Sequence, residues 1–142
     1  MLKSKYCLSS LNAEEILQHA CQYAQTQHFN VSIAVMDETG HLLAFRRLDG
    51  AMPMTANLSI EKARCSALSA KPSGLFENII KNGQMGFLTT QSFSGMLEGG
   101  EPILVEGQLI GGVGVSGVKS AQDAQIAQIA IQAFLKQHGF AQ

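Results

Sequence analysis

The chain has 142 residues, of which 46% are hydrophobic, so it is long enough for one domain with a substantial core but not for two. Its formal net charge of −1 gives no electrostatic basis for binding nucleic acid or an anionic membrane. The first residues lack the apolar core of a secretion signal, and no stretch approaches the ~20 apolar residues of a membrane-spanning helix. Three cysteines without CxxC spacing predict reduced thiols and a cytoplasmic protein.

The N-terminal half of the chain predicts a helix, a β-hairpin and two further helices. Asn12 followed by Glu15 forms a capping-box pattern at the start of an amphipathic helix. Ser59 is expected to cap the second helix, which Lys71-Pro72 ends. The predicted elements are a helix to about residue 27, strands at 31–36 and 42–48, and helices at 59–70 and 75–81.

Glycine dominates the segment that follows, because eight of the fourteen glycines lie between Gly95 and Gly117. Gly107-Gln108 separates two apolar runs, which predicts a two-residue hairpin turn with glycine in the first, left-handed position. Alternation along the second run places Gly112 and Gly114 on one face, together with Ile110 and Ser116. A face so bare requires something packed close to its backbone, either a helix of small residues or a ligand.

The remaining elements complete an α+β pattern. Residues 87–90 are predicted to form a short strand, and Ser120, with Asp123 as its capping-box partner, is predicted to cap a final alanine-rich helix. The resulting order is α-β-β-α-α-β-β-β-α. Because hairpins join most neighbouring strands, we expect an antiparallel sheet of about five strands with helices on its faces, of the profilin or PAS type. Residues 1–142 are expected to form a single domain.

Several blocks of the sequence resemble those of the GlcG/HbpS-like family, also called DUF336 or haem-degrading. Their order and spacing match the family from about residue 8 to residue 138. The blocks are 31–37, 40–44, 47–49, 59–64, 97–100, Pro102, 114–117 and 122–124. Glu101 departs from the family pattern, which more often has an apolar residue before this proline. The chain is similar to the stand-alone GlcG-like proteins encoded among carbon-catabolic genes, and to the OrfY type.

The resemblance implies a small-ligand-binding protein that holds haem, another tetrapyrrole or a similar hydrophobic anion as an accessory or carrier factor in carbon catabolism. Some relatives bind haem, and others form the C-terminal domain of corrinoid adenosyltransferases. The resemblance also implies a homo-oligomer built from dimers. Two other functions stay open: an enzyme acting on a small hydroxy- or carboxylic-acid metabolite, and a structural oligomerisation domain. The sequence shows no recognisable catalytic constellation and no metal-spaced cluster of histidine and cysteine.

The candidate site for such a ligand combines polar side chains with bare backbone. Lys62 is expected in the first helical turn, where a cation opposes the helix dipole, so it requires an anionic ligand or a carboxylate partner such as Asp49 or Glu98. Arg47 and Lys62 could hold a small carboxylate or a haem propionate beside the exposed glycine backbone. The predicted binding residues are Arg47, Asp49, Lys62, Glu98, Gly99, Gly100, Ser116 and His19.

Two further features have alternative interpretations. His19 lies beside the apolar stripe of the first helix and is either a ligand of haem iron or a partly exposed surface histidine. Met52 and Met54 flank Pro53 in one loop. Their flexible apolar side chains suit a subunit interface, a planar hydrophobic ligand, or the filling of gaps at the edge of the core.

Overall fold

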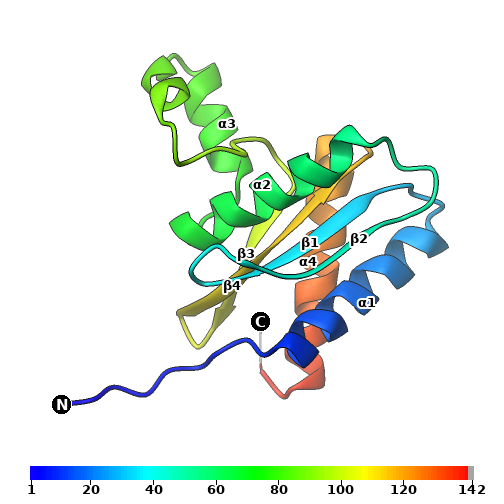
Figure 1. The fold of residues 1–142 in the computed structure, drawn as a ribbon, viewed down its shortest axis with the longest axis vertical. Helices are drawn as coiled ribbons and strands as arrows, with labels where there is room; N and C mark the ends of the chain where they lie inside the picture. The colour runs from blue at the N-terminus through cyan, green and yellow to red at the C-terminus, as the bar shows by residue number, and fades with distance from the viewer. Residues whose placement is uncertain (141–142) are drawn as a thin grey trace.

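The computed structural model describes residues 1–140 and shows helices on both faces of one antiparallel sheet (Figure 1). This confirms the predicted α+β class, although the sheet has four strands rather than about five. In chain order the elements are α1 (Ser10–Thr26), β1 (Ser32–Asp37), β2 (Leu42–Arg47), α2 (Met54–Ser69), α3 (Gly74–Lys81), the 3-10 helix η1 (Met85–Thr89), β3 (Gly100–Val105), β4 (Gln108–Ser116) and α4 (Ser120–Gln137).

The strands lie in the order β2-β1-β4-β3, and each neighbouring pair is antiparallel. Helices α1 and α4 pack together on one face, and α2 lies across the other face (Figure 1). Helix α3 and η1 extend beyond the sheet, at the upper end of the view in Figure 1. The central strands β1 and β4 are therefore covered on both faces, whereas β2 and β3 form the two edges of the sheet.

The hydrophobic core consists of two clusters, one on each face of the sheet. The larger cluster, beneath α1 and α4, contains fully buried Ile16, Ile33 and Ile126. Burying one such side chain contributes roughly 1.5–3 kcal/mol to stability. On this face the alanine-rich α4 buries Ala127 and Ala130 completely, in agreement with the expectation that helices cover the faces of the sheet. The smaller cluster lies beneath α2 and consists of Ala34, Met36, Ala63 and Ala67.

Helices α1 and α2 begin earlier than the sequence pattern predicted. The N-cap of α1 is Ser9, whose hydroxyl accepts a hydrogen bond from the Asn12 amide at 3.1 Å, while the Asn12 side chain accepts one from the Ser9 amide. Asn12 thus completes the capping box rather than starting it. Helix α2 begins at Met54 after Pro53, so Ser59 lies inside the helix and its hydroxyl donates to the Ala56 carbonyl.

The start of α4 also differs from the prediction. Its N-cap is Lys119, whose amide donates to the side chain of Gln122 at 3.3 Å, and Ser120 is already helical. Asp123 does not cap through a box with Ser120. Its carboxylate instead accepts from the amide of Val118 at 3.1 Å, before the helix begins. Asp123 therefore holds the segment between β4 and α4 in place through Oδ1. Its second carboxylate oxygen, Oδ2, points into the interior of the protein.

The β3–β4 hairpin turns one residue earlier than predicted. Glu106 and Gly107 both have positive φ angles, of 51° and 78°, and β4 begins at Gln108. Ladder pairing shifts so that Ile103 opposes Gly111 while Leu104 opposes Leu109, which leaves Ile110 as an extra residue. As a result, Ile110 belongs to the larger core cluster and does not share the face of Gly112 and Gly114.

Residues 87–90, predicted as a strand, lie mainly in the 3-10 helix η1. Local bonds favour this conformation, because the Thr89 hydroxyl donates to the Gly86 carbonyl and the Thr90 hydroxyl donates to the Phe87 carbonyl. The Phe87 ring also packs on Phe76 of α3 with a centroid distance of 5.6 Å. This packing holds the segment against α3 rather than against the sheet.

Candidate functional site

The bare glycine face of β4 is covered by a helix and not by an open pocket. A Cβ atom on Gly114 would lie 2.0 Å from the Ser59 carbonyl oxygen, and one on Gly112 would lie 2.6 Å from the Ala63 carbonyl oxygen. Such distances are far inside van der Waals contact, so only glycine allows α2 to lie this close. Of the two alternatives for this face, the structure shows the helix of small residues. The predicted pocket over Gly112 and Gly114 is therefore wrong.

Lys62 points into this interface and is paired inside the protein. Its Nζ donates to the Val115 carbonyl at 3.0 Å and lies 3.2 Å from Asp123 Oδ2, and the Lys62 residue is only 4% exposed. The predicted partners Asp49 and Glu98 were wrong, because Asp123 is the carboxylate that α4 directs inward. Burial raises the pKa of Asp123, an effect that the Lys62 ammonium partly opposes. Lys62 thus joins α2, β4 and α4 and has no free charge for a ligand.

Three other predicted residues, Ser116, Gly99 and Gly100, pack around the same interior. Ser116 ends β4 opposite Ser32 and is 5% exposed. Gly99 lies directly over Lys62, since a Cβ there would be 2.8 Å from the lysine Nζ. Gly100 exchanges hydrogen bonds with Ser73, whose hydroxyl accepts from the Gly100 amide at 2.8 Å and whose amide donates to the Gly100 carbonyl at 3.0 Å. Both glycines are therefore needed for close packing against α2 and Ser73.

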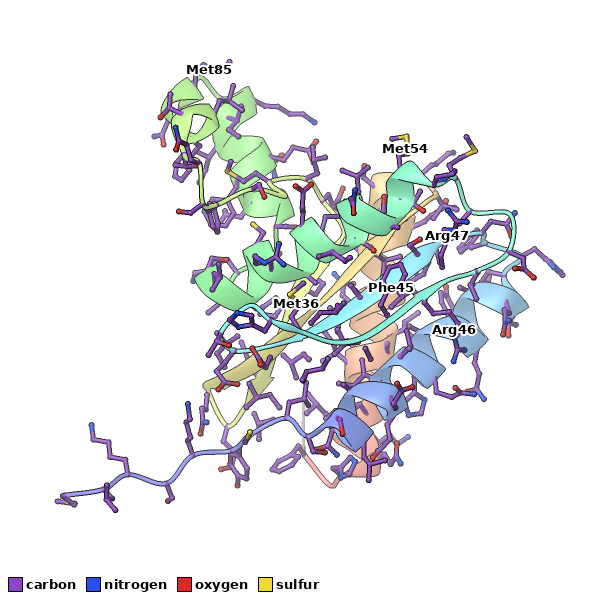
Figure 2. The ribbon with its side chains drawn as sticks, viewed as in Figure 1. Met36, Phe45, Arg46, Arg47, Met54 and Met85 are labelled. Carbon is purple, nitrogen blue, oxygen red and sulfur yellow. The ribbon has the colours of Figure 1, made fainter. Side chains whose placement is uncertain are left out.

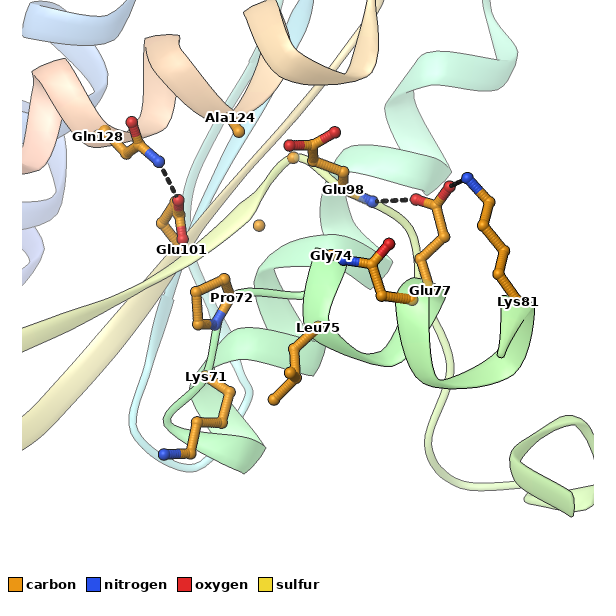
Figure 3. A pocket seen from close by; sticks show the side chains of 13 residues that line it. Lys71, Pro72, Gly74, Leu75, Glu77, Lys81, Glu98, Glu101, Ala124 and Gln128 are labelled. Atoms are coloured by element: carbon orange, nitrogen blue, oxygen red, sulfur yellow. Dashed lines mark hydrogen bonds and ion pairs between the residues drawn. The ribbon is translucent and has the colours of Figure 1, made fainter. Parts of the chain in front are cut away.

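The other side of Gly99 and Gly100 borders a cleft at the β3 edge, with a volume of about 590 Å³ (Figure 3). We call it the acidic cleft. Its walls come from α3 and the residues just before it, from the start of β3 and the residues just before it, and from α4. Its lining residues are Lys71, Pro72, Gly74, Leu75, Glu77, Asn78, Lys81, Glu98, Gly99, Gly100, Glu101, Ala124 and Gln128.

The carboxylates of the acidic cleft differ in their partners. Glu77 pairs with Lys81 at 2.9 Å and accepts the Glu98 amide at 2.8 Å, and these bonds hold the pKa of Glu77 below its usual range. Glu101 is 7% exposed and accepts a hydrogen bond from Gln128 Nε2. Burial is the main cause that raises the pKa of Glu101, and the nearby Glu98 raises it further.

Arg47 and Asp49 lie at the opposite edge of the sheet, in a second cleft of about 590 Å³. We call it the basic cleft. Its lining residues are Gln25, His28, Phe29, Asn30, Arg46, Arg47, Leu48 and Asp49. Figure 2 shows Arg46 beside α1 and Arg47 toward the start of α2, as expected for successive residues of a strand. Among residues 1–140, neither arginine forms an ion pair, and both are exposed.

His19 lies in a third region, on the outer surface of α1. Its Nε2 is 2.9 Å from Gln137 Oε1 of α4, so the side chain links the two helices. The predicted site residues thus separate into four groups. Glu98, Gly99 and Gly100 lie at the acidic cleft, Arg47 and Asp49 at the basic cleft, His19 on α1, and Lys62 and Ser116 in the interior.

Sequence reasoning missed several residues that line the clefts. Glu77 and Lys81 had a detectable signal, because they stand four residues apart on a helix, the spacing of an ion pair. Arg46 had one too, because it directly precedes Arg47 in the chain, whereas His28 had none, since its position beside Arg47 depends on how α1 packs on β2. In the part of the chain that the structure describes, no group of three His, Cys, Asp or Glu side chains could hold a metal ion. No described helix is long and apolar enough to cross a membrane.

Comparison with known proteins identifies similar sequences along most of the chain. The family model described as "Haem degrading protein HbpS-like" matches residues 8–132. Protein GlcG of Escherichia coli K12 is 43% identical over 115 residues, which are 81% of this chain and 85% of GlcG.

Solved structures share the fold. ORFY of Klebsiella pneumoniae has a TM-score of 0.85 at 27% identity, covering 94% of this chain and 96% of ORFY. HbpS has a TM-score of 0.79 at 27% identity, covering 94% of each chain. PduOC, in a complex with haem, has a TM-score of 0.81 at 24% identity, covering 90% of this chain and 95% of PduOC.

Proposed function

Because this chain belongs to the HbpS-like family of haem-degrading proteins, we propose that it binds haem or another hydrophobic organic anion in the basic cleft. It would act as an accessory or carrier factor in carbon catabolism. PduOC, which has the same fold, is described in a complex with haem, so the fold is compatible with this ligand. The proposal rests on one observation: two arginines without an ion-pair partner in residues 1–140 line the same cleft as Phe29 and Leu48.

The chemistry of the cleft fits a ligand that is both apolar and negatively charged. The guanidinium group of each arginine provides paired donors that match a carboxylate such as a haem propionate. Phe29 and Leu48 are half-buried and offer apolar contact. His28 lines the same cleft, and a neutral imidazole is a common ligand of haem iron. The cleft volume of about 590 Å³ lies within the range of small-molecule sites.

Titration with haemin, followed by the Soret absorption band, tests this proposal. Replacing both arginines by glutamine (Arg46→Gln with Arg47→Gln) should weaken haemin binding about a hundredfold or more, because each lost charge-assisted hydrogen bond contributes ~1.5–3 kcal/mol. A matched control removes the same charge elsewhere, through Lys3→Gln with Lys136→Gln, and should bind as the parent does. Equal affinity of the arginine variant and this control would contradict the assignment to the basic cleft.

The position of the Soret band distinguishes the two candidate iron ligands. In the proposed site, His28→Ala shifts the band, whereas His19→Ala leaves it unchanged because His19 lies on the outer surface of α1. The opposite result would place the ligand beside α1 and restore the alternative interpretation of His19.

A small hydroxy- or carboxylic-acid metabolite is the second candidate ligand, since the same arginines could hold its carboxylate. A thermal-shift screen with a panel of small organic acids, run beside the haemin titration, separates the candidates. Stabilisation by one acid without haemin binding would favour an enzyme acting on that acid. No response in either screen would favour a structural oligomerisation domain.

We further propose that the protein is a homo-oligomer with a largely apolar interface. Helix α3 has no buried residue, and Leu75, Met85 and Leu88 are each more than 40% exposed on α3 and η1. Met52 and Met54 are also exposed, at 65% and 66%. Exposed apolar groups of this kind typify subunit contacts. Light scattering at micromolar concentration should give a multiple of the chain mass, and Leu88→Glu should reduce it. A monomer mass for the parent would contradict this proposal.

The proposed location is the cytoplasm. Cys7, Cys21 and Cys65 are all unpaired, which suits a reducing compartment. Fractionation of cells that express the protein tests this location, and recovery outside the cytoplasmic fraction would contradict it.

A further inference from the structure

Glu101 is a buried carboxylate whose hydrogen bonding is incomplete. Only 7% of the residue is exposed, and Oε1 accepts the bond from Gln128. Oε2 has no hydrogen bond to any described residue, yet it is not among the atoms fully sealed from solvent. Since Glu101 lines the acidic cleft, its remaining contact with solvent runs through that cleft.

The charges around Glu101 do not balance. Glu77 is neutralised by Lys81, and the Lys62–Asp123 pair behind Gly99 is neutral as a pair. Glu98 and Glu101 form no ion pair with the residues that the structure describes. The side chain of Lys71 extends away from both in Figure 3. An ionised carboxylate as buried as Glu101 is costly without a cationic partner, and none of the described residues supplies that positive charge through an ion pair.

The geometry of the cleft restricts the cation that could supply this charge. Figure 3 shows Glu98, Ala124 and the Glu101–Gln128 pair lining one part of the cleft. Pro72, Leu75 and Ala124 add apolar surface to the same cleft. A metal ion would require more ligands, and residues 1–140 contain no group of three that could hold one. An ammonium group on a short alkyl chain suits both the two carboxylates and the apolar wall.

We propose that the acidic cleft binds a small alkylammonium ligand, with its charged nitrogen between the carboxylates of Glu98 and Glu101 and its carbon chain against Leu75 and Pro72. This site lies at the opposite edge of the sheet from the basic cleft and does not depend on the function proposed there. Glu101 accepts a hydrogen bond from the ammonium through Oε2 while Gln128 holds Oε1. Glu98 provides the second, more exposed acceptor.

Isothermal titration with n-butylamine and 1,4-diaminobutane at neutral pH, where both are protonated, tests the proposal. Saturable binding of at least one amine is expected, and butyrate, which has a similar carbon chain but the opposite charge, should not bind at this site. Glu101→Gln should weaken amine binding at least tenfold, because it removes the charge but keeps the shape and the contact with Gln128. Glu14→Gln, an exposed change of equal charge on α1, should leave amine affinity unchanged.

Other results would overturn the proposal. These are the absence of saturable amine binding by the parent protein, equal affinity of the Glu101→Gln and Glu14→Gln variants, or binding of Mn²⁺ in place of amines. If Glu101→Gln does not fold, Glu98→Gln provides the same test on a half-buried residue, and unchanged amine affinity in that variant counts against the site. Haemin binding to the basic cleft can succeed or fail independently of each of these results.

Discussion

Strand β4, in the centre of the sheet, and strands β2 and β3, at its edges, differ in what covers them. On one face of β4, Gly112 and Gly114 pack against small residues of α2. On the other face, the valines of β4 belong to the core beneath α1 and α4. The edges lie beside open clefts, one rich in carboxylates and the other in arginines. Bare backbone in the centre therefore serves helix packing. In residues 1–140, the two clefts lie at the edges of the sheet, where the helical layers end.

The largest loss of stability is expected on replacing Lys62, which links α2 to β4 and α4 at the centre of the molecule. Lys62→Ala leaves Asp123 buried without its cation and should lower the free energy of unfolding by ~3–5 kcal/mol, measured by denaturant titration. A double variant, Lys62→Met with Asp123→Asn, should recover much of this loss because it keeps the acceptor for Val118 but removes the charge. If Lys62→Ala instead weakens haemin binding at full stability, the centre is a ligand site after all.

The second-largest loss of stability is expected on replacing Gly114, and it tests whether the glycine face of β4 packs against α2. Gly114→Ala forces a methyl group to within about 2.0 Å of the Ser59 carbonyl oxygen, so it should destabilise the protein by ~3 kcal/mol or more. Gly86→Ala is the control, because nothing lies within 4 Å of that position. Equal melting temperatures for the two variants would mean that α2 does not rest on β4.

A smaller effect is expected on the opposite face of the sheet. Ala127→Leu adds volume where α4 meets the sheet and should cost ~1–3 kcal/mol. Gln125→Leu adds the same side chain on the exposed side of α4 and should leave the melting midpoint nearly unchanged. An unchanged midpoint for Ala127→Leu would refute the packing of this helix.

The smallest change in stability is expected at the β3 edge, where the substitution of Glu101 should stabilise the protein rather than destabilise it. Because burial raises the pKa of Glu101, the folded protein binds this proton more tightly than the unfolded chain does. The ionised carboxylate therefore lowers stability above the folded pKa, and this loss disappears as pH falls toward the unfolded value. Glu101→Gln should raise Tm by about 2–4 °C at pH 7, corresponding to ~1 kcal/mol.

The difference in Tm between Glu101→Gln and the parent should shrink as the pH falls through the folded pKa of Glu101. Calorimetry from pH 7 to pH 4 measures it, with Glu14→Gln as the control for net charge. A difference that grows on acidification would show that Glu101 is stabilised as a carboxylate inside the fold. The edge would then resemble the centre, where charges are paired internally.

Local sequence patterns were sufficient to predict most secondary-structure elements of this protein and to indicate its family. Apolar spacing predicted all four α-helices and both hairpins, because helical and strand periodicities depend only on near neighbours. The helix starts and the 87–90 segment were wrong, since competing caps and the packing of Phe87 on Phe76 decide them. The glycines of β4 correctly indicated a close neighbour on one face, but a sequence pattern cannot say whether that neighbour is a ligand or α2.

Tertiary structure alone decided which side chains meet. Lys62 pairs with Asp123, 61 residues away, because the packing of α2 and α4 around β4 brings the two side chains together, and no spacing along the chain encodes this contact. The site residues predicted as one group are divided because Arg47 and Glu98 belong to segments at opposite edges of the sheet. Strand order is set by long-range pairing and by the burial of apolar faces. The electrostatic difference between the two clefts therefore arises only when the four strands assemble.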